Sequence, residues 1–161
     1  MSSPYRKIAA ALVFISLGFA SCDKSKDPTY SVIPELTYKS VNTTSVSYKD
    51  TGRWEMYYDF VDGDGNIGTD YTDSALVVNI KNVTTGVSYK YPFPYVPPAS
   101  RYGKKYLKGA GSISLAKNVF FLPRIDTIHV ERDTFKFEVF VTDNAGNQSN
   151  TISSPDIFVH P

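Results

Sequence analysis

After residue 34, apolar and polar side chains alternate with a period of two in several short runs. The run RWEMYYDFV, at residues 53–61, places four large apolar side chains on one face: Trp54, Met56, Tyr58 and Phe60. The run TFKFEVFVT, at residues 134–142, repeats the pattern. Such alternation is typical of a β-strand with one buried face. We expect these two strands to be central.

Weaker alternation predicts six further strands, at residues 35–41, 44–48, 75–83, 87–91, 111–115 and 154–159. Turn-forming steps such as Thr85-Gly86 separate several of them. No window after residue 22 shows a sustained helical pattern. Short strands in a chain of this length predict an all-β fold, a single immunoglobulin-like antiparallel β-sandwich of about 7–8 strands. A small barrel is the alternative.

The first 22 residues have the features of an export signal. Arg6 and Lys7 precede an uncharged apolar run at residues 8–20, which is too short to span a bilayer. The following Phe-Ala-Ser-Cys resembles the lipobox of bacterial lipoproteins, although Phe19 stands where an aliphatic residue is usual. Cys22 is the one cysteine of the chain, so it cannot form an internal disulfide. We expect Cys22 to be acylated; an ordinary secretory signal is the alternative.

The expected organisation is a signal peptide at residues 1–21, a lipidated tether at residues 22–33 and one domain at residues 34–161. The tether is polar and lacks periodicity, which predicts a flexible segment between lipid and domain. The chain has a formal charge of +1, and cleavage leaves 15 basic and 16 acidic side chains. This balance gives no reason to expect a nucleic-acid partner. We expect a lipid anchor in the bacterial outer membrane, on its periplasmic or its cell-surface face.

Three segments resemble uncharacterised lipoproteins of Bacteroidota that have a predicted immunoglobulin-like domain. They are FVDGDGNIG (residues 60–68), YLKGAGSISL (residues 106–115) and FKFEVFVTDNAGNQSNTISSPDI (residues 135–157). Within the last, TDNAGNQSN is also similar to the F to G hairpin of fibronectin type III-like modules. The resemblance implies an envelope location and a β-sandwich, and it carries no catalytic residues.

The segment DFVDGDGNIGTD, at residues 59–70, has oxygen-bearing side chains at alternate positions: Asp62, Asp64 and Asn66. This is the spacing of the first ligands in a calcium loop, but Ile67 occupies the position of the EF-hand glycine and the loop follows a strand. An EF-hand is therefore excluded, whereas oxygen ligands on an irregular loop still suit calcium. In the alternative interpretation, the Asp-Gly steps only turn the chain.

Topology adds a fourth candidate ligand. If the strands at residues 53–61 and 134–142 are strands B and F of the sandwich, the loops that follow them emerge at the same end. Asp143 would then face the first acidic loop. We therefore predict a calcium site formed by Asp62, Asp64, Asn66 and Asp143, and we expect no other cofactor.

The segment YKYPFPYVPP, at residues 89–98, places aromatic side chains between prolines. Tyr91, Phe93 and Tyr95 could form a stacking platform for a glycan or a ridge for a peptide. Alternatively, they close an edge of the sandwich. The following RYGKKYLK, at residues 101–108, mixes basic and aromatic side chains. It predicts a solvated loop or a contact with an anionic glycan or lipid headgroup.

No spacing typical of a catalytic triad or a metal hydrolase is present, so we expect the protein not to be an enzyme. Ser74 and Thr127 lie in tripeptides that resemble the O-glycosylation pattern of exported Bacteroidota proteins. We expect a non-catalytic, lipid-anchored envelope protein that binds a glycan or a protein ligand. A structural or assembly subunit of an envelope complex is the alternative.

Overall fold

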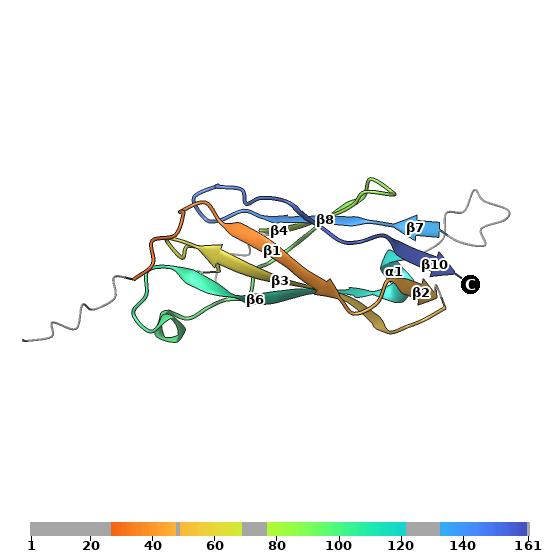
Figure 1. The fold of residues 1–161 in the computed structure, drawn as a ribbon, viewed down its shortest axis with the longest axis horizontal. Coiled ribbons are helices and arrows are strands. Elements are labelled where there is room, and N and C mark those ends of the chain that lie inside the picture. The colour runs from red at the N-terminus through yellow and green to blue at the C-terminus, as the bar shows by residue number, and fades with distance from the viewer. Residues whose placement is uncertain (1–26, 48, 69–76, 122–132, 161) are drawn as a thin grey trace, which may run out of the picture.

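The computed structural model describes residues 27–47, 49–68, 77–121 and 133–160. In these ranges the chain forms an all-β sandwich, which confirms the predicted fold class. The molecule is elongated, with strands stacked in layers along its long axis (Figure 1). The first described residues lie at one end of this axis, and the short helix α1 (Lys117–Phe120) lies toward the other.

One sheet has the strand order β1-β3-β6, and both of its pairings are antiparallel. Its strands are β1 (Glu35–Val41), β3 (Arg53–Asp62) and β6 (Leu107–Ala116). β3 is central, as its alternation predicts. The four apolar side chains on its inner face are all buried: Trp54, Met56, Tyr58 and Phe60.

β6 is longer than the strand predicted at residues 111–115, because it pairs with β3 along the whole length of both strands. Gly111 lies opposite Tyr58 in this register. A Cβ atom on Gly111 would lie 2.7 Å from Cζ of Tyr58, so only glycine leaves room for the ring. The glycines in this segment therefore reflect close packing rather than a turn.

The facing sheet has the order β5-β4-β8-β9, and its strands are β4 (Val78–Asn82), β5 (Ser88–Tyr91), β8 (Phe137–Val141) and β9 (Ile152–Ser153). β8 lies inside this sheet, as predicted. A smaller sheet has the order β2-β10-β7, with strands β2 (Ser45–Ser47), β7 (Asp133–Phe135) and β10 (Ile157–His160). The strand predicted at residues 134–142 is thus divided at Lys136, whose carbonyl accepts a hydrogen bond from the Val83 amide at 2.8 Å.

Four rings pack together at the end of the core where β3 begins: Trp54, Phe121, Phe135 and Phe137. Their centroids lie 5.2–5.7 Å apart in the contacting pairs, and each side chain is at most 1% exposed. The Trp54 indole donates a hydrogen bond to the Thr43 carbonyl at 3.0 Å. This end of the core is therefore apolar, and its one polar ring atom is satisfied.

The two helices of the described chain are α1 and the 3₁₀ helix η1 (Pro98–Arg101). Neither has the length or apolar character needed to cross a membrane. Phe121, directly after α1, completes the aromatic cluster.

Candidate metal centre

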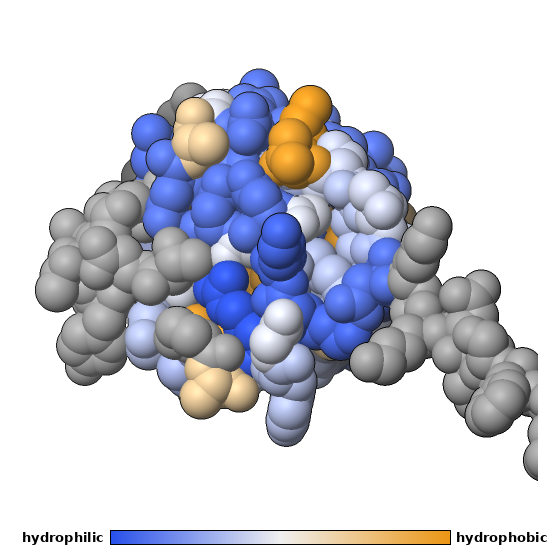
Figure 2. All heavy atoms as spheres, turned by 90° about the vertical axis from the view of Figure 1, so that its left-hand side faces the viewer, coloured by the Kyte–Doolittle hydropathy of each residue, from blue (hydrophilic) through white to orange (hydrophobic). Residues whose placement is uncertain are grey.

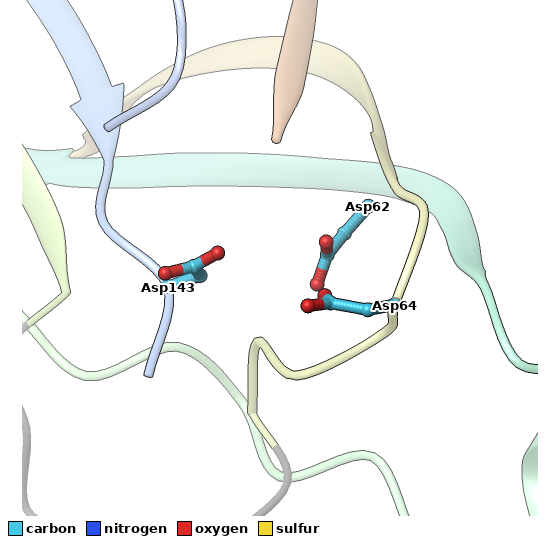
Figure 3. A group of neighbouring side chains, drawn as sticks. All are labelled: Asp62, Asp64 and Asp143. Carbon is cyan, nitrogen blue, oxygen red and sulfur yellow. The ribbon is translucent and has the colours of Figure 1, made fainter. Parts of the chain in front are cut away.

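Three carboxylates meet at the end of the sandwich where β3 and β8 finish. Asp62 is the last residue of β3, Asp64 lies in the loop that follows, and Asp143 lies two residues after β8. One carboxylate oxygen from each lies within 4.8 Å of the others. Figure 3 shows the three side chains pointing toward one another from two separate chain segments. The two loops thus come together as the strand B and F assignment predicts.

Asp62 supplies both a turn and a candidate ligand. Its side chain is fully buried, and its Oδ2 accepts a hydrogen bond from the Ile67 amide at 3.0 Å. Its Oδ1 has no hydrogen-bond partner among the described residues. Buried polar atoms are nearly always paired, so this oxygen requires an explanation. The turn interpretation accounts for one oxygen of Asp62, and a cation would account for the other.

Asparagine side chains hold the other two carboxylates in place. Asp143 is 4% exposed and accepts two hydrogen bonds from Asn147, from its amide at 2.7 Å and from its side-chain nitrogen at 2.8 Å. The Asn66 side-chain nitrogen donates to Oδ2 of Asp64 at 2.9 Å. Asn66 thus orients the Asp64 carboxylate through its side-chain nitrogen, and its own role as a ligand stays a prediction. Asp64 is exposed, so the centre is open to solvent on one side.

The centre carries uncompensated negative charge. Within the described residues, the ion pairs are Lys39–Asp59, Lys104–Asp27 and Lys117–Asp50, and none of them includes Asp62, Asp64 or Asp143. Burial raises the pKa of Asp62 to about 6; the Ile67 amide opposes this shift, and a hydrogen bond shared with the Asp64 carboxyl group and the charges of Asp64 and Asp143 reinforce it. Carboxylates this close repel unless a proton or a cation lies between them.

The predicted aromatic platform is divided by the structure. Phe93 packs edge-on against Phe60 at a centroid distance of 5.1 Å, so it closes the flank of the core. Tyr91 and Tyr95 are more exposed, at 38% and 41%. Alternate residues share one face of a regular strand, but β5 ends at Tyr91, so the proline-containing segment that follows is free to turn Phe93 alone into the core.

A groove of about 170 Å³ lies beside Tyr91, between the β5 and β6 edges of the two sheets. Its lining combines aromatic, proline and hydroxyl-bearing residues, among them Tyr58, Tyr91, Pro92, Pro94, Ser112 and Ser114. This volume is below the roughly 300–1,000 Å³ of most small-molecule pockets. The groove therefore has room for one ring or one side chain.

The predicted modification sites Cys22, Ser74 and Thr127 lie outside the described residues, and they stay predictions. Comparison of the chain with protein-family models, curated proteins and solved structures finds no match. Function is therefore proposed from the fold, the carboxylate centre and the predicted export signal.

Proposed function

We propose that the protein is a non-catalytic, lipid-anchored module of the bacterial envelope with an immunoglobulin-like sandwich that binds calcium at one end. The observation that carries the calcium proposal is the meeting of three carboxylates, one of which is fully buried with an oxygen that lacks a hydrogen-bond partner among the residues described. A cation would satisfy this oxygen and remove the repulsion among Asp62, Asp64 and Asp143 at the same time.

The donor set favours calcium over other biological cations. It contains only oxygen, and calcium accepts irregular arrangements of carboxylates, carbonyls and water, whereas magnesium requires a nearly ideal octahedron. Zinc and copper sites use histidine or cysteine, and neither residue belongs to this group. Because Asp64 is exposed, water would complete the coordination. Extracellular calcium sites of this kind bind at about 0.1–1 mM.

Calcium here would act as a structural clamp. Asp62 ends β3 and Asp64 lies in the loop after it, whereas Asp143 follows β8 of the facing sheet. A shared ion would connect the two sheets at their open end. Ligand that binds only the folded state stabilises it by about 2.7 kcal/mol at a hundredfold excess over Kd.

Thermal unfolding in calcium and in chelator tests this proposal. We expect calcium to raise Tm in the native sequence and to have little effect in Asp64→Asn. Asp59→Asn is the matched control, because Asp59 lies on β3 outside the carboxylate group, its side chain is 44% exposed and it pairs with Lys39. A Tm that calcium does not move in the native chain would contradict the proposal and leave residues 59–70 as a turn.

We propose a second role, the binding of a glycan or protein ligand at the groove beside Tyr91. The support is the exposed Tyr91 ring beside prolines and serine hydroxyls, since an aromatic face with nearby hydroxyls suits a sugar ring or a peptide side chain. Tyr91→Ala should abolish capture of envelope material by the native lipoprotein. Tyr57→Ala is the control, because Tyr57 is equally exposed at 38% but lies on β3. Capture that survives Tyr91→Ala would favour the assembly-subunit alternative.

The anchor is tested separately through Cys22. Cys22→Ser should move the protein from the membrane fraction to the soluble fraction, and the intact mass should lose the lipid. Equal partitioning of the variant and the native protein would contradict the lipoprotein proposal.

A further inference from the structure

Residues 27–31, which the sequence predicts to be flexible, are packed against the domain. The Gly63 amide donates a hydrogen bond to the Ser31 carbonyl at 2.8 Å, and the Tyr30 ring lies edge-on to Tyr106 at 4.9 Å. A Cβ atom on Gly63 would lie only 2.4 Å from the Ser31 carbonyl oxygen, so glycine is required for this approach. The part of the chain nearest the predicted anchor is therefore held at the carboxylate end.

A basic loop lies beside this docked segment. Residues 101–108 contain four basic side chains and no acidic one: Arg101, Lys104, Lys105 and Lys108. Lys104 forms an ion pair with Asp27 of the docked segment, and Lys108 lies over the Tyr30 ring at 5.5 Å. The Arg101 guanidinium donates to the Gly65 carbonyl, which joins the loop to the calcium-binding segment.

Tyr102 projects from this loop and is 90% exposed, the most exposed large hydrophobic side chain of the described residues. It occupies the left-handed region at φ 50°, followed by Gly103 at φ 74°. Val32 and Ile33, directly after the docked segment, are also more than half exposed. Figure 2 shows that the surface at this end is mostly hydrophilic, with small hydrophobic groups among the polar ones.

The length of chain before Asp27 places this end close to the bilayer. Cys22 and Asp27 are five positions apart, and a fully extended chain spans at most about 18 Å over that length. The headgroup region of one leaflet occupies about 5–8 Å of that reach. A hollow of about 390 Å³ opens between the docked segment and the basic loop, lined among others by Tyr30, Lys105, Tyr106 and Asp27, whose carboxylate is paired with Lys104. Its volume falls in the range of small-ligand sites, roughly 300–1,000 Å³.

We infer that the docked segment and the loop at residues 101–108 form a membrane-contact surface that binds the anionic phospholipid headgroups of the bilayer carrying the anchor. Tyr102 enters the interfacial layer, where tyrosine is favoured, and the Lys105 ammonium contacts headgroup phosphate at the hollow. The inference rests on the proposed lipid anchor at Cys22. It adds an orientation, because the carboxylate end then faces the membrane and the aromatic end faces away from it.

The experiment uses the full native lipoprotein in vesicles that contain phosphatidylglycerol or only phosphatidylcholine. Acylation consumes the Cys22 thiol, so one new cysteine gives a unique labelling position. Ser100→Cys places a fluorophore on exposed η1 beside Tyr102, and Val119→Cys places it on α1, 55% exposed, at the opposite end. Spin-labelled headgroups should quench the probe at position 100 and leave the probe at position 119 unaffected.

Two further variants separate headgroup binding from mere tethering. Lys105→Glu or Tyr102→Ala in the Ser100→Cys background should lower the quenching by several-fold in phosphatidylglycerol vesicles. Lys81→Glu, a reversal of an exposed charge on β4, should leave it unchanged. Quenching that is the same in both lipid compositions and in all three variants would overturn the inference. If the intact mass shows no lipid and the protein does not associate with vesicles, the lipid anchor at Cys22 would be refuted instead.

Discussion

The two ends of β3 bury side chains of opposite character, apolar rings at one end and a carboxylate at the other. At one end, Trp54 packs against three phenylalanine rings, and its single polar atom is hydrogen-bonded. At the other end, Asp62 is equally buried but keeps one oxygen without a partner and lies beside two further carboxylates. β3 thus connects an apolar end, where the polar atom of Trp54 is hydrogen-bonded, to an acidic end, where a proton or a cation is needed to offset the repulsion among carboxylates.

This difference separates stability that depends on conditions from stability that does not. Apolar burial and ring contacts at the Trp54 end respond little to pH or divalent ions. Stability at the Asp62 end depends on which species neutralises the carboxylates. The two ends should therefore respond differently to the same changes in solution.

The largest effect is expected from Phe137→Ala. Phe137 is fully buried and contacts both Trp54 and Phe121, so its loss should reduce the free energy of unfolding by about 3–5 kcal/mol. Because the three carboxylates of the proposed calcium site all lie at the other end, the loss should be equal in calcium and in chelator. Urea unfolding measures both values. Phe158→Ala, at a half-exposed position, is the control and should stay within about 0.5 kcal/mol.

Asp62→Asn should destabilise the protein when calcium is present but not when calcium is removed by chelator. In saturating calcium the variant should lose up to about 2.7 kcal/mol, because the stabilisation by bound ion disappears. In chelator it should be at least as stable as the native protein, because an amide removes the repulsion with Asp64 and Asp143. Urea unfolding under the two conditions gives the comparison. A loss of equal size in both would contradict the calcium proposal.

The pH dependence of the calcium-free protein provides a third test. The folded-state pKa of Asp62, about 6, lies above the unfolded value, so the folded state holds a proton that the unfolded state releases. The corresponding stability, about 3 kcal/mol, is complete below about pH 4 and is lost as the pH rises through 6. Asp62→Asn should remove this loss. Calcium requires the carboxylate form, so its affinity should fall as the pH drops below about 6.

The smallest effect is expected from Asn147→Ala. Asn147 orients Asp143 through two hydrogen bonds without being a predicted ligand, and removal of such a supporting residue weakens metal binding by about tenfold or more. Isothermal titration should therefore give a higher Kd for calcium. Gln148→Ala, at the exposed neighbouring position, is the control. An unchanged Kd in Asn147→Ala would show that Asp143 does not need this support, or is not a ligand.

Much of the fold follows from local pattern. Period-two alternation predicts β3 and β8, their buried faces and their central places, because a strand must direct one face to the core whatever its partner. The same holds for part of the site. Alternate spacing places Asp62 and Asp64 in one loop, and the sandwich topology indicates that Asp143 approaches them.

Other features depend on contacts between distant residues. Gly109 and Gly111 of β6 lie against the Phe60 and Tyr58 rings, and these rings belong to β3, about fifty residues earlier in the chain. Phe93 lies against the core because its ring packs edge-on against the ring of Phe60.

Local sequence was enough to predict most strands, the apolar face of the core and the acidic loop, since each depends on the order of neighbouring residues. Only the packed chain shows that Ser31 meets Gly63, that Asp27 meets Lys104 and that Asp62 is buried with an oxygen that has no partner among the described residues. Hydrogen bonding and desolvation act through space, so they are defined only once the whole chain has packed.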